Sequence, residues 1–165
     1  MKKTLLPLVL FCTVLTINAQ NNDFEKSSPK QAKHEIKLNA LYSLLAIPEI
    51  SYEYLLNEDS ALGASVLLAL NDDTDLNFAF TPYYRFYFGD KPTAGFFIEG
   101  FGMYSTRDDY DIVTNDFALG LGLGGKFLSK NGFVGELYVG VGRNLFGNHD
   151  IEGIPRIGIS IGKRF

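Results

Sequence analysis

This chain of 165 residues has little cysteine, no excess of positive charge and few long apolar runs. The single cysteine, Cys12, lies near the N-terminus. The 15 basic and 19 acidic side chains give a net charge of −4, and no basic stripe is present, so nucleic acid is not an expected partner. Beyond the N-terminal segment no apolar run reaches the roughly 18 residues that a membrane helix needs. A membrane role can therefore come only from strands.

The first 19 residues are predicted to be a signal peptide. Lys2 and Lys3 precede an apolar run from Leu5 to Ile17, and Ala19 offers a small residue at a cleavage point. A short buried helix is the alternative. Removal of residues 1–19 would remove Cys12, so the remaining chain could form no disulfide and no cysteine site. Residues 20–33 are polar and are predicted to form a flexible tail.

Residues 34–165 are dominated by side chains that alternate between apolar and small or polar. In the last stretch, Ile157, Ile159, Ile161 and Phe165 share one face. A period of two indicates β-strands with one apolar face. The predicted fold is all-β, an eight-stranded antiparallel up-and-down transmembrane β-barrel. Its strands are expected at about 35–45, 49–56, 61–70, 77–88, 95–105, 116–127, 132–143 and 154–165.

The connections between these strands differ on the two sides. Residues 57–60, 89–94 and 129–132 are predicted as tight turns, whereas 71–76, 106–115 and 144–153 are predicted as longer, mostly acidic loops. The exception on the loop side is the short connection 46–48. Short turns at one end and longer loops at the other are typical of outer-membrane barrels.

The residue types on the two faces indicate which face meets lipid. The apolar set is rich in large aromatic and branched side chains, and the opposite set is mainly Gly, Ala, Ser and Thr with about one charge per strand. Small residues suit the inside of a narrow eight-stranded barrel. Aromatic side chains recur at the strand ends, as in interfacial girdles: Phe88, Phe127, Phe133 and Phe165 on the turn side, and Tyr42, Phe78 and Phe117 on the loop side. A soluble exported β-barrel or sandwich remains the alternative, because periodicity alone cannot decide.

The chain resembles the small OmpA/OmpX-type outer-membrane barrels of Gram-negative bacteria. The resemblance rests on the strand count, the signal segment, the stretches 97–102 and 120–125, and the closing residues 162–165. It implies location in the cell outer membrane and contact with outer-membrane lipid and lipopolysaccharide. It also implies that the terminal aromatic, Phe165, helps the barrel-insertion machinery to recognise the last strand. Lys163 departs from the apolar outward row and could snorkel to head groups.

Seven charged side chains are predicted to face the lumen and to form a salt-bridge network that plugs it. An unpaired charge in a narrow, poorly hydrated core is costly, so these groups should pair. Core pairing is the favoured interpretation, and a gate or proton path is the alternative. The residues are Lys37, Glu53, Arg85, Glu99, Lys126, Glu136 and Arg156.

Two sequence motifs match enzyme signatures but lack the required context. Residues 120–125 match G-x-G-x-x-G, yet the glycines alternate within a strand rather than opening a helix. Residues 158–162 match G-x-S-x-G, yet no acid or histidine follows Ser160. The sequence therefore predicts no cofactor and no catalytic residue.

The loops carry two further candidates. Acidic clusters could bind Ca²⁺ weakly, although solvated loop charge is the simpler interpretation; their residues are Asp72, Asp73, Asp75, Asp108, Asp109 and Asp111. His149 is one of two histidines and is more consistent with a solvated loop residue than with catalysis. The function expected is that of a structural or surface-exposed outer-membrane protein with an unknown partner. A lipid-modifying barrel enzyme and a narrow transport channel are the alternatives.

Overall fold

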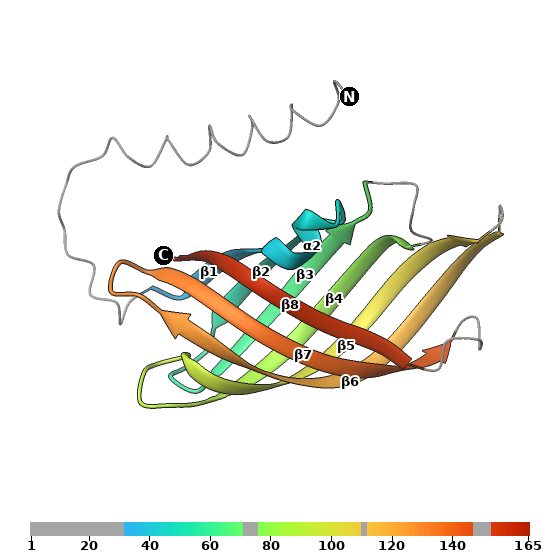
Figure 1. The fold of residues 1–165 in the computed structure, drawn as a ribbon. Coiled ribbons are helices and arrows are strands. Elements are labelled where there is room, and N and C mark those ends of the chain that lie inside the picture. Colours follow the sequence, from blue (N-terminus) through green and yellow to red (C-terminus); the bar gives the residue numbers. More distant parts are fainter. Residues whose placement is uncertain (1–31, 71–75, 110–111, 147–152) are drawn as a thin grey trace, which may run out of the picture.

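The computed structural model describes residues 32–70, 76–109, 112–146 and 153–165. These residues form a closed antiparallel barrel in which each strand pairs with its neighbours in sequence and the last strand pairs with the first (Figure 1). The strands are β1 (His34–Asn39), β2 (Glu49–Leu55), β3 (Ser60–Leu68), β4 (Leu76–Phe88), β5 (Gly95–Asp109), β6 (Ile112–Leu128), β7 (Phe133–Phe146) and β8 (Gly153–Arg164). The predicted eight-stranded all-β barrel is confirmed. No helix in the described ranges is long and apolar enough to cross a membrane.

Backbone hydrogen bonds between β1 and β8 close the barrel. The pairing runs from Glu35 opposite Arg164 to Asn39 opposite Ser160. One residue further, the backbone of His34 exchanges two hydrogen bonds with Phe165, at 3.1 and 2.9 Å. Closure leaves no strand edge with free N–H and C=O groups over this part of the wall.

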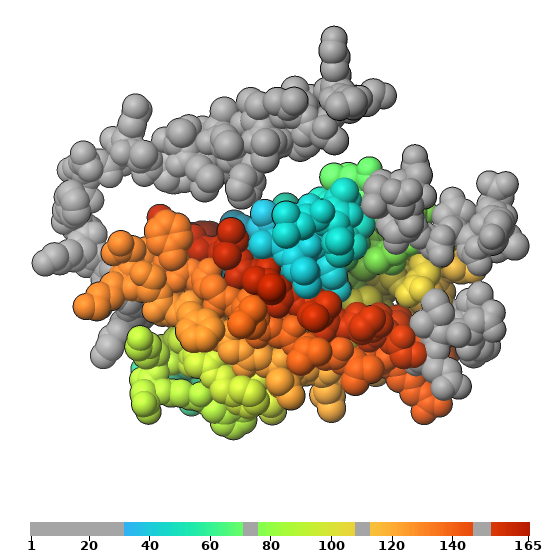
Figure 2. Space-filling view, in the orientation of Figure 1, coloured from blue at the N-terminus to red at the C-terminus, as the bar shows by residue number. Residues whose placement is uncertain are grey.

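The predicted strand 35–45 is wrong in its second half. β1 ends at Asn39, and residues 40–44 form the short helix α2 (Ala40–Leu44). The Asn39 side chain accepts a hydrogen bond from the Tyr42 N–H at 3.4 Å, and the Ser43 hydroxyl donates to the Asn39 carbonyl at 2.7 Å. Local capping of this kind competes with strand pairing. Tyr42 is therefore not a strand-end residue of an aromatic girdle, and α2 lies against β8 on the outside of the barrel (Figure 2).

The predicted long loop at 106–115 is also wrong. β5 continues to Asp109 and β6 begins at Ile112, with continuous pairing from Gly95 opposite Lys126 to Asp109 opposite Ile112. Polar and acidic residues here extend a two-stranded ribbon instead of forming a loop. We refer below to the turn end of the barrel, with connections 56–59, 89–94 and 129–132, and to the opposite loop end.

The two faces of the wall are segregated as alternation requires. Outward positions carry large apolar side chains that are exposed, such as Leu121 at 74%, Phe127 at 69% and Ile161 at 59%. Inward positions are buried and include most of the charged residues of the strands. A water-soluble barrel would place these two sets the other way round.

Inward aromatic rings are accommodated by glycines directly across the sheet. Tyr138 lies opposite Gly158, and a Cβ at that glycine would come within 2.2 Å of the tyrosine ring. The same relation holds for Phe101 and Gly120, where the distance would be 2.3 Å. Phe97 with Gly124 and Tyr83 with Gly63 repeat it. The alternating glycines of β6 are thus part of the interior packing.

Candidate functional site

The structure places all seven predicted lumen residues in the barrel interior. Each is at least 96% buried, including Glu99, whose strand has aromatic residues on both faces. Phe97 and Phe101 share the inward face of β5 with Glu99, while Phe96 and Ile98 point outward and are exposed. Every one of the seven makes at least one ion pair with a partner inside the barrel.

Two lysines occupy the space between three glutamates near the turn end. Lys126 Nζ lies 2.7 Å from Glu35 and 3.2 Å from Glu136, and it also contacts Glu53. Lys37 Nζ lies 2.8 Å from Glu136 and also contacts Glu53. Carboxylate oxygens of the three glutamates lie within 4.8 Å of one another, a spacing that could suit a cation. The two ammonium groups already supply that positive charge.

Arg85 connects this cluster to the middle of the barrel. Its Nη1 lies 2.9 Å from both Glu53 and Glu136, and its Nε lies 2.7 Å from Glu99. The guanidinium also stacks 4.3 Å from the ring centre of Phe97 and 4.5 Å from that of Tyr83. The planar guanidinium has several donors in a fixed arrangement, and here two of its nitrogens serve three carboxylates.

Arg156 extends the network towards the loop end. Its Nε donates to Glu99 at 2.7 Å and its Nη1 to Glu49 at 3.1 Å. Three neutral groups complete the shell of Glu49: the Ser65 hydroxyl at 2.6 Å, the Asn39 amide at 2.8 Å and the Tyr138 hydroxyl at 3.1 Å. The Glu49 carboxylate therefore accepts hydrogen bonds from four protein groups.

The connection 89–94 covers the turn end of the lumen. Arg164 pairs with Glu35 at 2.6 Å and donates to the carbonyls of Pro92 at 3.1 Å and Thr93 at 2.9 Å. The Thr93 N–H in turn donates to the Glu58 carbonyl at 2.6 Å. Thr93 has φ of 45°, an unfavourable value for a β-branched residue. These hydrogen bonds hold the turn in a strained shape, and Thr93 and Ala94 are buried beneath the charged cluster.

Three members of the network were missed by the sequence prediction: Glu35, Glu49 and Arg164. With them the network consists of five carboxylates (Glu35, Glu49, Glu53, Glu99, Glu136) and five cations (Lys37, Arg85, Lys126, Arg156, Arg164), so the formal charge of these ten side chains is zero. Asp116 is also buried and pairs with Arg107 at the loop end. Period-two alternation from Lys37, Glu53 and Gly162 would have pointed to them. All three stand at the ends of the expected strands, where a charged side chain can reach water at the barrel rim and need not join a network in the lumen.

The other predicted residues lie away from this network. Phe165 is 56% exposed and stacks on the His34 ring with centroids 5.9 Å apart. Asp108 and Asp109 belong to the end of β5, where their side chains are not described. Outside the described residues lie the signal segment 1–19, nearly all of the tail 20–33, and four further candidates: Asp72, Asp73, Asp75 and Asp111, together with His149.

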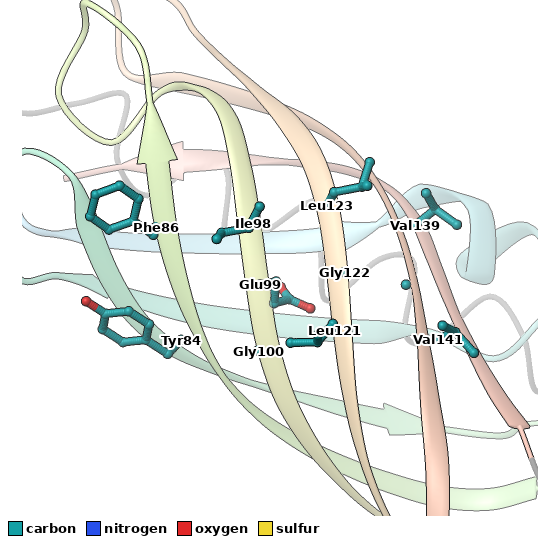
Figure 3. A pocket seen from close by; sticks show the side chains of 11 residues that line it. Tyr84, Phe86, Ile98, Glu99, Gly100, Leu121, Gly122, Leu123, Val139 and Val141 are labelled. Carbon is teal, nitrogen blue, oxygen red and sulfur yellow. The ribbon is translucent and has the colours of Figure 1, made fainter.

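The outer surface carries shallow apolar grooves where outward glycines interrupt the rows of large side chains. One groove of about 550 Å³ crosses β4 to β7 and is lined by Tyr84, Phe86, Ile98, Leu121 and Val139 around Gly100 (Figure 3). A second, of about 910 Å³, lies over β1, β8, β7 and β6 at the turn end. Both face away from the ion-pair network.

Comparison with solved structures agrees with the fold. The barrel is similar to the N-terminal β-barrel domain of Pseudomonas aeruginosa OprF, with a TM-score of 0.62 and 16% sequence identity over 82% of this chain and 98% of the other. The resemblance to OmpA-type eight-stranded barrels is thereby confirmed for the fold. No curated protein matches the sequence. A family model does match over residues 5–145, and the chain belongs to that family, described as a protein family of unknown function, DUF3575.

Proposed function

We propose that this chain is an outer-membrane β-barrel protein that acts as a structural or surface-exposed anchor and whose lumen is closed to ions. The observation that carries the proposal is the contrast between its two faces. Exposed Phe, Leu, Ile and Val side chains cover the outside, and a charge-neutral set of ten paired side chains fills the inside. Apolar side chains are stable against lipid, whereas charged side chains must be kept away from it.

Closure of the lumen follows from what surrounds the ion pairs. The rings of Tyr83, Phe97, Phe101 and Tyr138 share the interior with the network and are buried. Eight strands enclose a bore that side chains can fill completely. An ion in transit would have to separate a guanidinium or ammonium from the buried carboxylates that it pairs with, which costs several kcal/mol per group.

A catalytic role receives no support from the described residues. His34 stands at the turn end, where its Nδ1 lies 2.6 Å from the Tyr52 hydroxyl on the outer face. The ion-pair network has its donors and acceptors engaged with each other. A non-enzymatic role as a membrane anchor for the loop-end segments is therefore the proposal.

Two measurements test the membrane location of the barrel. Membrane fractionation of the producing cell should place the protein in the outer membrane, and its band should shift on heating in a gel. A freely dissolved periplasmic monomer would contradict the proposal.

In planar bilayers the protein should give no large, stable conductance. Glu136→Gln should lower the unfolding temperature, because it weakens contacts to Lys37 and Arg85, without opening a pore. A large channel in the unmodified protein would overturn the closed lumen.

A further inference from the structure

The groove at the turn end contains a slot in the otherwise continuous apolar surface. In the outward row formed by Leu38, Ile161, Gly135 and Phe127, each residue lies directly opposite the next on the adjacent strand. A Cβ at Gly135 would meet nothing within 4 Å, so the space between Ile161 and Phe127 is open. The slot is lined mainly by apolar side chains, which suits a hydrocarbon chain.

A cation stands directly beyond the slot. Lys163 lies in the next outward row towards the turn end, opposite Ile36 on one side and Phe133 on the other. Its ammonium is 5.7 Å from the centre of the Phe133 ring, and the side chain is exposed. Two basic side chains point outward from the described strands. Lys163 lies in the half near the turn end, and Arg143 lies at the loop end.

The adjacent turn adds a second positive charge. Residues 129–132 connect β6 to β7, and the Gly132 carbonyl accepts a hydrogen bond of 2.8 Å from the Arg164 N–H next to Lys163. This fixes the turn beside the end of β8, and Lys130 in that turn is exposed. The groove thus combines an apolar slot on the wall with positive charge at its outer end.

We infer that this groove, lined by Gly135, Phe127, Phe133, Ile161 and Lys163, binds an acidic phospholipid of the leaflet on the turn side. One acyl chain lies in the slot over Gly135, and the head-group phosphate meets the Lys163 ammonium. The inference depends on the proposed membrane location and goes beyond it by assigning a selective lipid site. Charge complementarity distinguishes this groove from the one over Gly100, whose lining holds no exposed cation.

The test uses the absence of tryptophan from the chain. Phe127→Trp places a fluorescent reporter in the groove, and Leu121→Trp places one at the groove over Gly100. Each variant is reconstituted in phosphatidylcholine vesicles containing brominated phosphatidylglycerol or brominated phosphatidylcholine. Quenching at Phe127→Trp should be stronger with phosphatidylglycerol, while Leu121→Trp should be quenched equally by both lipids.

Two second-site variants assign the effect to the groove. Lys163→Gln should reduce the preference for phosphatidylglycerol at the reporter about fivefold, because one lysine near an anionic surface contributes that factor. Gly135→Leu fills the slot without a clash and should weaken quenching by both lipids. Arg143→Gln is the matched control and should leave the preference unchanged.

The outcomes separate this inference from the proposed location. Equal quenching by both lipids at Phe127→Trp, or a preference that survives Lys163→Gln, would overturn the lipid site even when the protein is correctly inserted. Emission of Leu121→Trp that stays characteristic of water, with no heat-dependent gel shift, would instead show that the barrel is not in the bilayer, and both proposals would fail.

Discussion

The two ends of the barrel are built differently. At the turn end, Arg164 reaches Glu35 at 2.6 Å and ties down the connection 89–94, so the charged cluster is sealed by backbone. At the loop end, Arg107 approaches Asp116 at 3.4 Å and its side chain keeps 22% of its exposure. Buried ion pairs with complete hydrogen bonding resist disruption, whereas pairs open to water contribute little. The stability of the barrel is therefore expected to lie in its middle and turn end.

Strand lengths add to this difference. β1 and β2 have 6 and 7 residues, against 15, 17 and 14 for β5, β6 and β7. The last β1–β8 pair is Asn39 with Ser160, so the part of β8 from Gly153 to Ile159 pairs with β7 alone. Proline lacks a backbone N–H, so Pro155 leaves no unpaired donor at this edge. The Asn39 side-chain amide donates to the Ile157 carbonyl at 3.4 Å and so satisfies one of the edge acceptors. The differences in strand length and the unpaired edge of β8 both lie at the loop end.

The largest effect is expected from Arg85→Met in the middle of the barrel. The substitution leaves Glu53, Glu99 and Glu136 with one partner fewer each and an excess of negative charge. Breaking a buried pair in this way costs about 3–5 kcal/mol. Urea unfolding in lipid vesicles, followed by the heat-dependent gel shift, measures the loss.

Arg143→Met serves as the matched control for Arg85→Met, because Arg143 points outward at the loop end. Its effect on the free energy of unfolding should stay within about 0.5 kcal/mol. Similar losses for the two variants would mean that the interior network is no more important to stability than the surface.

Arg164→Gln tests the seal at the turn end and should cost about 1.5–3 kcal/mol, the range for hydrogen bonds to a charged group. Arg164 pairs with one carboxylate, Glu35, whereas Arg85 pairs with three, so the loss is smaller than at Arg85. Hydrogen exchange at Thr93 and Ala94 should accelerate, while amides in the middle of β6 should stay protected. Unchanged exchange at the turn would show that the hydrogen bonds from Arg164 do not hold it.

The sequence was sufficient for the barrel and for the direction of its faces, because alternation along eight strands carries that information. It was sufficient for Lys37, Arg85 and Glu136 because they stand in the middle of strands. It failed at Tyr42, where Asn39 and Ser43 favour a helical turn that alternation does not reveal. It also missed Arg164 as a partner of the 89–94 turn, because that contact joins residues 71 positions apart.

The smallest effect is expected at the loop end from Asp116→Asn. The substitution removes the charge that pairs with Arg107 but keeps an oxygen that can accept the hydrogen bond from the Asn144 amide, which is 3.0 Å long. Because the pair is 3.4 Å long and the Arg107 side chain is 22% exposed, the loss should be about 1 kcal/mol. It should shrink further in concentrated salt, which screens exposed charges over about 3 Å at 1 M. The loss from Arg85→Met should persist in the same salt, since its partners are buried. Urea unfolding of both variants at low and high salt measures this, and a salt-independent loss of several kcal/mol at Asp116 would mean that the loop end is as tightly closed as the turn end.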